Sequence, residues 1–147
     1  MPSRHKSREL ALQMLFQWEV GEHSPGEVLA TFLPPLKAEP EVKEFARSLF
    51  EGTISDVDTI DPLLRRHAEH WKLERMAAVD RNVLRLALYE MLHRPETPAA
   101  VVINEAIELA RRFSTAESVE FVNGVLDAVR KSLPSLALDA KNLPASG

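Results

Sequence analysis

The chain of 147 residues contains no cysteine. Disulfide bonds, cysteine nucleophiles and cysteine-ligated zinc or iron–sulfur centres are therefore excluded, and a reducing compartment is expected. No apolar run approaches the roughly 20 residues that a membrane-spanning helix needs, and the N-terminus has no apolar core of a signal peptide. We therefore expect a cytoplasmic protein, and its length is that of a single domain.

The sequence also has no recognisable catalytic motif: no phosphate-binding glycine loop, dinucleotide fingerprint, His-Glu-x-x-His pair or Gly-x-Ser-x-Gly elbow. His67 and His70 lie three residues apart, but no third metal ligand accompanies them at a known spacing. Asp56, Asp58 and Asp61 resemble part of a calcium loop, whose required glycine and distal glutamate are missing. We therefore expect no metal site, no cofactor and no enzymatic activity.

Strand patterns are absent as well, since no segment alternates apolar and polar residues with β-branched side chains. Apolar residues recur instead at helical spacing along most of the chain. This pattern predicts an all-α fold of about seven helices, arranged in two halves near residues 1–72 and 73–133 that share one core. Residues 134–147 contain two prolines and several polar residues, so we expect a loosely ordered C-terminal tail.

The strongest helical pattern is a hairpin of two helices between residues 99 and 133. Ser114, followed three residues later by Glu117, predicts a capping box at the start of the second helix. Gly124 lies in the middle of that helix, where glycine costs roughly 1 kcal/mol relative to alanine. We therefore expect another backbone to approach Gly124 closely.

Two other helices carry useful signals. A long apolar pattern begins near Pro40 and reaches Leu64, and Pro62 predicts a kink or a restart there with Asp61 as the cap. Asp80 is expected to cap a strongly apolar helix that packs on two sides. The few polar residues of that helix fit either ion pairs or a strip that faces a partner.

Charge is distributed unevenly along the chain. The net charge of −4 argues against a broad nucleic-acid-binding surface. The first eight residues, however, contain Arg4, His5, Lys6 and Arg8 and no acid, although the start of a helix favours acids. These cations are either a solvated end or a patch for phosphates, in which Arg4 and Arg8 would share one face.

Several segments together carry the signatures of a known family. They are Asp-Arg-Asn-Val-Leu-Arg-Leu-Ala-Leu-Tyr-Glu at 80–90, Val-Ile-Asn-Glu-Ala-Ile-Glu-Leu-Ala at 102–110, Phe-Val-Asn-Gly-Val-Leu-Asp at 121–127, and the basic run that leads into Ala-x-Gln-x-Leu-aromatic, ending at Phe16. In these segments the chain resembles the NusB family of transcription antitermination factors. The likeness covers nearly the whole chain, apart from residues 21–43 and the tail after Leu133.

The resemblance implies a non-enzymatic adaptor that binds boxA, a short single-stranded element of nascent RNA, together with the small-subunit ribosomal protein NusE. That complex would join an elongating RNA polymerase with NusA and NusG and suppress premature termination, notably in ribosomal RNA operons. The RNA-binding residues that the resemblance implies are Arg4, His5, Lys6, Arg8, Phe16, Glu117 and Phe121. The implied contacts with the protein partner are Trp71, Asp80 and Arg85.

Alternatives remain open at this stage. Phe121 is either a core residue or an RNA-facing aromatic. The chain could be a helical interaction scaffold or a homo-oligomer without RNA binding of its own, and a homodimer is compatible with either role. A stand-alone form of the NusB-like domain of ribosomal RNA cytosine methyltransferases is a third idea, against which the lack of a catalytic domain counts. Under the RNA-binding hypothesis, we expect the first cations and the bend between the last two helices to meet in one shallow cradle.

Overall fold

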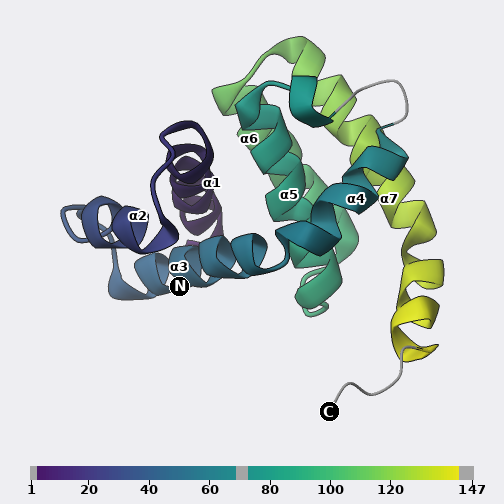
Figure 1. Cartoon of the computed structure of the whole chain (residues 1–147), viewed down its shortest axis with the longest axis horizontal. Helices are drawn as coiled ribbons and strands as arrows, with labels where there is room; N and C mark the ends of the chain where they lie inside the picture. Colours follow the sequence, from purple (N-terminus) through teal and green to yellow (C-terminus); the bar gives the residue numbers. More distant parts are fainter. Residues whose placement is uncertain (1–2, 69–72, 143–147) are drawn as a thin grey trace.

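The computed structural model describes residues 3–68 and 73–142, and within these ranges it has seven α-helices, one short 3-10 helix and no strand (Figure 1). The prediction of an all-α fold with about seven helices is confirmed. The helices are α1 (Arg4–Val20), α2 (Pro25–Phe32), α3 (Pro40–Ser55), α4 (Val57–His67), α5 (Ala78–His93), α6 (Ala99–Phe113) and α7 (Ala116–Asn142), with the 3-10 helix η1 (Leu73–Arg75) before α5.

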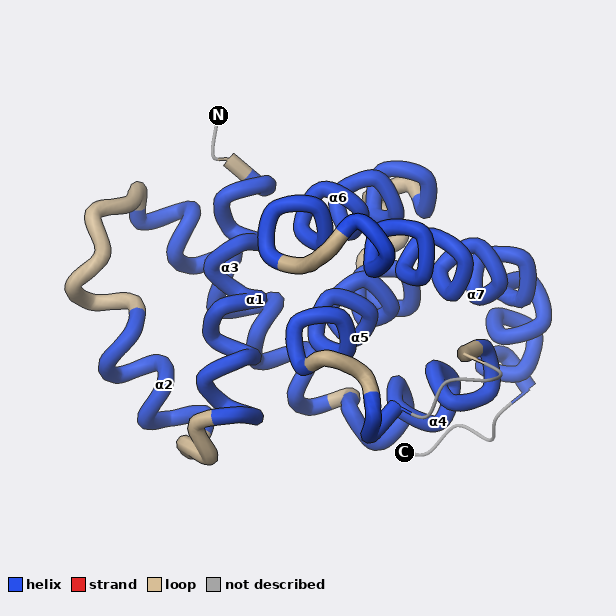
Figure 2. The backbone as a smooth tube through the Cα atoms, turned by 90° about the horizontal axis from the view of Figure 1, so that it is seen from above, coloured by secondary structure: helices blue, strands red, loops and turns tan. Residues whose placement is uncertain are grey.

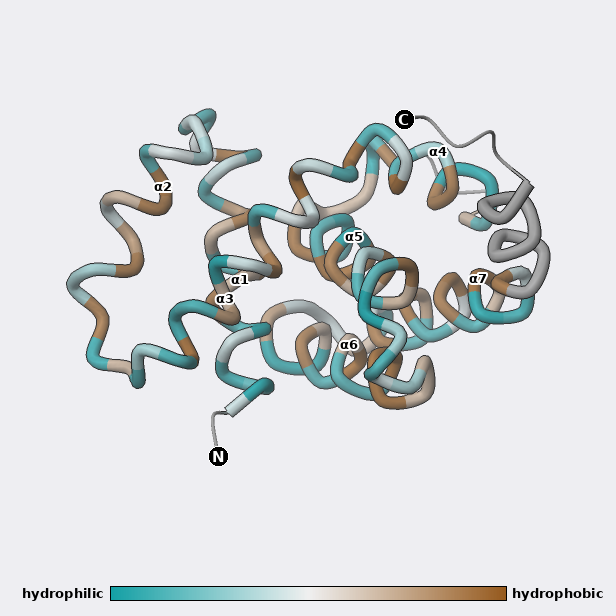
Figure 3. Tube along the Cα trace, turned by 90° about the horizontal axis from the view of Figure 1, so that it is seen from below, coloured by the Kyte–Doolittle hydropathy of each residue, from teal (hydrophilic) through white to brown (hydrophobic). Residues whose placement is uncertain are grey.

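Helix α5 is the centre of the molecule, because it contacts α1, α3, α4, α6 and α7 (Figure 2). Leu84, Leu86 and Leu88 on this helix are completely buried, as its apolar pattern predicted. The other helices carry both hydrophobic and hydrophilic positions, and their apolar stripes contribute to one continuous core (Figure 3). No helix in the described ranges is long and apolar enough to cross a membrane.

The long pattern that begins at Pro40 breaks at Asp56, not at Pro62 as expected. Asp56 has φ −106° and ψ 7° and separates α3 from α4, whereas Pro62 lies inside α4. A proline keeps a helical φ and removes one backbone donor, which this helix tolerates. Asp61 is not a cap, since its carboxylate accepts hydrogen bonds from Arg85. Helix α4 packs on α5 and α7, so we group it with them, and α1, α2 and α3 form the other group.

Helix α7 differs from expectation at both ends. Its cap is Thr115, whose Oγ1 accepts a hydrogen bond from the backbone N–H of Ser118 at 3.2 Å, while the Ser114 hydroxyl turns to Asp80. The helix then continues through Pro134 to Asn142, where the sequence predicted a loose tail. The alanines, leucines and lysine after Pro134 are good helix formers, which accounts for the continuation.

Two helical glycines, Gly52 and Gly124, have opposite surroundings. A Cβ atom built on Gly124 meets no atom within 4 Å, so the predicted close approach is wrong for the described part of the chain. A Cβ atom on Gly52 of α3 would overlap with the ring of Tyr89 on α5. Gly52, which the sequence did not single out, is therefore the glycine that permits close helix packing.

Candidate nucleic-acid interface

The first turn of α1 is fixed in place by two serines. Ser3 caps the helix, because its Oγ accepts a hydrogen bond from the backbone N–H of Lys6 at 3.2 Å. Ser7 is buried, and its hydroxyl donates to the backbone carbonyl of Val42 at 2.9 Å. The cations of this turn therefore start from a backbone that is held against α3.

A buried carboxylate gathers these cations. Glu9 has a side chain only 3% exposed, and its oxygens lie 2.9 Å from Nε2 of His5, 3.8 Å from Nζ of Lys6 and 2.8 Å from Nη1 of Arg112. Arg112 comes from the last turn of α6 and is well exposed. Glu9 and Arg112 were not predicted from the sequence, although the four-residue spacing of His5 and Glu9 was a visible signal.

His5 also connects α1 to α6. Its Nδ1 lies 2.9 Å from a carboxylate oxygen of Glu105. The hydrogen bond with Glu105 raises the pKa of His5, partial burial opposes this shift, and the charges of Glu105 and Glu9 add to it. Near neutral pH, His5 is therefore more often a cation than an isolated histidine would be.

Arg8 is buried, which corrects the expectation that Arg4 and Arg8 form one exposed pair. Its Nε and Nη2 donate to the two carboxylate oxygens of Glu90 at 2.7 and 2.9 Å, and its side chain is only 6% exposed. Arg8 faces α5, where the buried Glu90 needs an opposite charge. Arg4, by contrast, is exposed, and its guanidinium carbon lies 3.6 Å from the ring centroid of Phe45.

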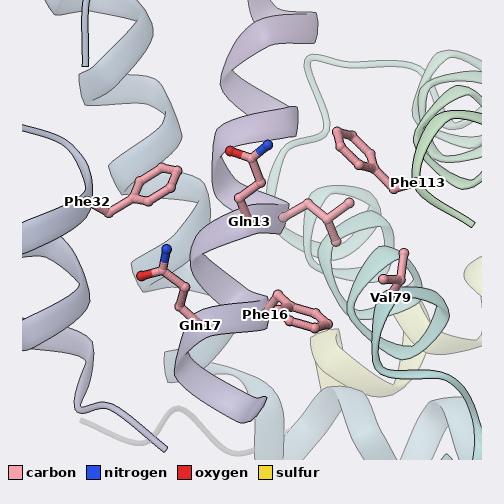
Figure 4. Close-up of a pocket in the computed structure, with 7 residues that line it drawn as sticks. Gln13, Phe16, Gln17, Phe32, Val79 and Phe113 are labelled. Atoms are coloured by element: carbon pink, nitrogen blue, oxygen red, sulfur yellow. The ribbon is translucent and has the colours of Figure 1, made fainter. Parts of the chain in front are cut away.

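An apolar groove opens further along α1. Phe16 is 39% exposed and lines a groove of about 360 Å³ between α1, α2, α5 and α6. The other residues that line it are Leu12, Gln13, Gln17, Phe32, Val79 and Phe113. In Figure 4, Gln13 and Gln17 project from α1 between Phe32 of α2 and Phe113 of α6. The groove therefore offers aromatic surface together with amide groups that can form hydrogen bonds.

Glu117 and Phe121 line a second depression of about 230 Å³ at the start of α7, together with Asp80. Glu117 is exposed, whereas Phe121 is half-buried and packs against the core while it lines this depression. Val79 lines the groove around Phe16, and Asp80 lines the depression at the start of α7. The groove and the depression are therefore adjacent at the first turn of α5.

The first cations and the bend between α6 and α7 were expected to meet in one shallow cradle, but they lie along an elongated surface. Helices α1 and α6 run in the same direction, because His5 contacts Glu105 and Glu9 contacts Arg112. The cations of the first turn lie at one end of this surface, whereas Phe16, Glu117 and Phe121 lie toward the other end. We call the whole region the α1–α6 surface.

Asp80 and Arg85, two of the residues expected to contact a protein partner, form hydrogen bonds and ion pairs within the chain. Asp80 is buried and accepts hydrogen bonds from the hydroxyls of Ser114 and Ser118, both at 2.7 Å. Arg85 is buried as well and pairs with Glu19 and Asp61. Of the two alternatives for the polar residues of α5, ion pairs or a partner-facing strip, the structure shows ion pairs. Trp71 lies outside the described residues.

Metal ligands do not gather in the described ranges, where no three His, Asp or Glu side chains are placed to hold an ion. His67 lies on α4, where burial lowers its pKa and the charge of Arg66 lowers it further. His70 lies outside the described residues.

Comparison with known proteins gives one consistent answer. The model of the NusB family matches residues 5–131. The transcription antitermination protein NusB of Koribacter versatilis (strain Ellin345) is 54% identical over 132 residues, which cover 89% of this chain and 90% of that protein. The protein of the same name from Solibacter usitatus (strain Ellin6076) is 49% identical over 136 residues, covering 91% of this chain and 92% of that protein.

Solved structures agree with the sequence relatives. NusB of T. maritima has a TM-score of 0.81 at 39% identity, over 89% of this chain and 93% of that one. A chain from a crystal structure of antitermination factors NusB and NusE in complex with dsRNA has a TM-score of 0.79 at 25% identity, over 88% of this chain and 96% of that one. The chain therefore belongs to the NusB family.

Proposed function

We propose that this protein is a transcription antitermination factor, an adaptor without enzymatic activity that binds boxA-type single-stranded RNA together with the ribosomal protein NusE. The names of its relatives and the NusB–NusE–RNA complex among its structural neighbours support this proposal. We further propose that the complex acts in the cytoplasm on an elongating RNA polymerase with NusA and NusG, and allows it to read through terminators, notably in ribosomal RNA operons.

The observation that carries the proposal is the combination of cations and an open aromatic side chain on the α1–α6 surface. Lys6, His5 and Arg112 are gathered around Glu9, and Phe16 is exposed on the same helix. Cations neutralise phosphates, and stacking of a base on an aromatic ring contributes roughly 1–3 kcal/mol. These are the two kinds of contact that unpaired RNA needs.

The residues proposed to contact RNA are those that the structure leaves accessible: Arg4, His5, Lys6, Phe16, Glu117 and Phe121. Arg8 acts indirectly, because it anchors α1 to α5. Few contacts of this kind give modest affinity, so a second protein that extends the RNA surface is expected to be needed for tight binding. We propose NusE for that role, with Trp71 still predicted as one of its contacts.

The direct test is a titration of fluorescently labelled boxA RNA with the protein, in the presence and absence of NusE. Phe16→Ala should weaken RNA binding by about fivefold to a hundredfold, the equivalent of one lost stacking contact. Val20→Ala is the matched control, because Val20 is an exposed apolar residue on the same helix. Failure of the wild-type protein to bind boxA RNA even with NusE would contradict the proposal.

A helical interaction scaffold or homo-oligomer is the second candidate, and the apolar groove around Phe16 favours it, since such grooves also bind protein side chains. Analytical ultracentrifugation, together with the RNA titration, distinguishes the scaffold from the RNA-binding adaptor. A dimer that Phe16→Ala dissociates, in a protein without RNA affinity, would support the scaffold and contradict the adaptor.

A further inference from the structure

Two guanidinium groups from distant parts of the chain meet on one aromatic ring. The guanidinium carbon of Arg4 lies 3.6 Å from the ring centroid of Phe45, and that of Arg94 lies 5.5 Å from the same centroid. Arg4 begins α1, Phe45 lies on α3, and Arg94 directly follows α5. Cation–π attraction accounts for part of this arrangement, because the face of an aromatic ring is electron-rich.

Neither guanidinium has an acidic partner within the described part of the chain. Arg8, Arg81, Arg85 and Arg112, by contrast, form ion pairs there. The side-chain hydrogen bond of Arg94 is neutral, from Nη2 to Oγ of Ser48 at 3.2 Å. Like charges that are held near each other repel, so an anion placed beside them is favoured.

The position of this pair extends the α1–α6 surface. Arg4 directly precedes His5 and Lys6, and it lies twelve residues before Phe16, which is roughly 18 Å along the helix. The first turn of α1 thus lies between two groups of side chains. Glu9 and Arg112 are on one side, and Phe45 with Arg94 is on the other. A single strand that crosses Phe16 and the cations can continue over Arg94.

We propose that Arg4 and Arg94, held against Phe45, form a binding site for backbone phosphates of the single-stranded RNA. Phe45 is a positioning residue, because its ring orients both guanidinium groups, while the N–H donors of Arg4 and those of Arg94 that do not bind Ser48 can reach phosphate oxygens. The site rests on the proposed function, since it needs RNA on the α1–α6 surface. The site adds Arg94, which is far from the basic N-terminal segment in the sequence and does not belong to a basic run.

The test is the salt dependence of boxA RNA binding, measured by fluorescence anisotropy with NusE present. Arg94→Gln should weaken binding by roughly fivefold at 0.1 M salt and reduce the slope of log K against log salt by about 0.7, the value for one phosphate of a single strand. Arg94→Lys should retain most of the slope, because the charge remains. Arg130→Gln removes an exposed arginine of α7 and should change neither quantity.

Ser48→Ala separates a phosphate contact from a purely structural role. It removes the internal hydrogen bond of Arg94 and leaves the charge, so RNA binding should stay within twofold of wild type. If Ser48→Ala weakens binding as much as Arg94→Gln, or if Arg94→Gln changes the affinity for NusE without RNA, the phosphate site is refuted.

The outcomes also distinguish this inference from the proposed function. A wild-type protein that does not bind boxA RNA contradicts the function itself. A wild-type protein that binds RNA, is weakened by Arg4→Gln and is unaffected by Arg94→Gln retains the function and contradicts only the second arginine. Thermal melting by circular dichroism checks that each variant is folded.

Discussion

The buried ion pair between Arg8 and Glu90 makes the stability of each charged side chain depend on the other. Both side chains are almost completely buried and share two hydrogen bonds between α1 and α5. Replacement of one partner by an apolar residue leaves an unpaired charge in the core. Replacement of both partners by apolar residues of similar volume leaves no buried charge.

We therefore predict that Arg8→Met lowers the free energy of unfolding by about 3–5 kcal/mol, because Glu90 stays buried without a counter-charge. The double variant Arg8→Met/Glu90→Leu should recover most of that loss, and Arg4→Gln should stay within about 0.5 kcal/mol of wild type. Urea denaturation measures all three. If Arg8→Met were as stable as Arg4→Gln, the ion pair would not anchor α1.

His5 gives a prediction about pH. Its pKa is raised, chiefly by the hydrogen bond with Glu105, so protonated His5 stabilises the folded protein. That contribution is complete below the unfolded value of about 6.5 and is lost as the pH rises through the higher folded pKa. An NMR titration of the ring should give a midpoint above 6.5 in wild type and a lower one in Glu105→Gln. A wild-type midpoint at or below 6.5 would contradict the contact.

Residues differ in how far the sequence predicts their roles. The exposure of Arg4 and Lys6 followed from cations at a helix start, where stability favours acids. The burial of Arg8 did not follow, because a spacing of four residues gives direction around a helix but not depth in the fold. Arg94 and Phe45 were missed because tertiary packing alone brings them to the start of α1.

At the scale of elements, Gly52 and Gly124 give opposite predictions. Gly124→Ala should raise the free energy of unfolding by about 0.5–1 kcal/mol, since a methyl group there meets no atom and the helix gains propensity. Gly52→Ala should lower it by about 1–3 kcal/mol, since the Tyr89 ring must move. Denaturant melts of both variants measure the difference. Equal effects in the same direction would contradict the packing of α3 on α5.

Helix identity was predictable, but helix boundaries were less so. The apolar periodicity of α5, α6 and α7 marks three helices that the structure confirms. The break at Asp56 was missed because Pro62 is the stronger local signal, although a proline inside α4 is tolerated. The turn before α7 was assigned to the wrong cap, since Ser114 is drawn to Asp80 by tertiary contacts.

At the scale of the whole molecule, an ion-pair network joins three helices. Glu19 of α1 pairs with Arg81 and Arg85 of α5, and Arg85 also pairs with Asp61 of α4. Burial alone would raise the pKa of Glu19, but hydrogen bonds from Arg81 and Arg85 and their charges lower it overall. This network links the two groups of helices.

We predict that Glu19→Gln lowers the free energy of unfolding by about 2–3 kcal/mol at neutral pH, because two partly buried arginines lose a charged partner. The contribution of Glu19 is present above its unfolded pKa of about 4.5 and is lost as the pH falls through the lower folded value. Stability curves of wild type and variant should therefore converge in acid. A constant difference down to pH 2 would contradict the lowered pKa.

The whole surface was harder to predict than the family. The family signatures cover most of the chain, and together with the helical periodicity they were enough to predict the fold. The arrangement of the cations relative to Glu117 and Phe121 depends on how α1 lies along α6, which no local pattern specifies. An elongated surface was therefore found where a single cradle was expected.

The most direct test of the account is hydrogen–deuterium exchange on the complex with NusE, with and without boxA RNA. If RNA lies along the α1–α6 surface, it should protect the backbone amides of residues 4–6, the segment around Phe16 and residues 112–121, and leave α4 unchanged. Protection on α4 with none along α1 and α6 would contradict the account.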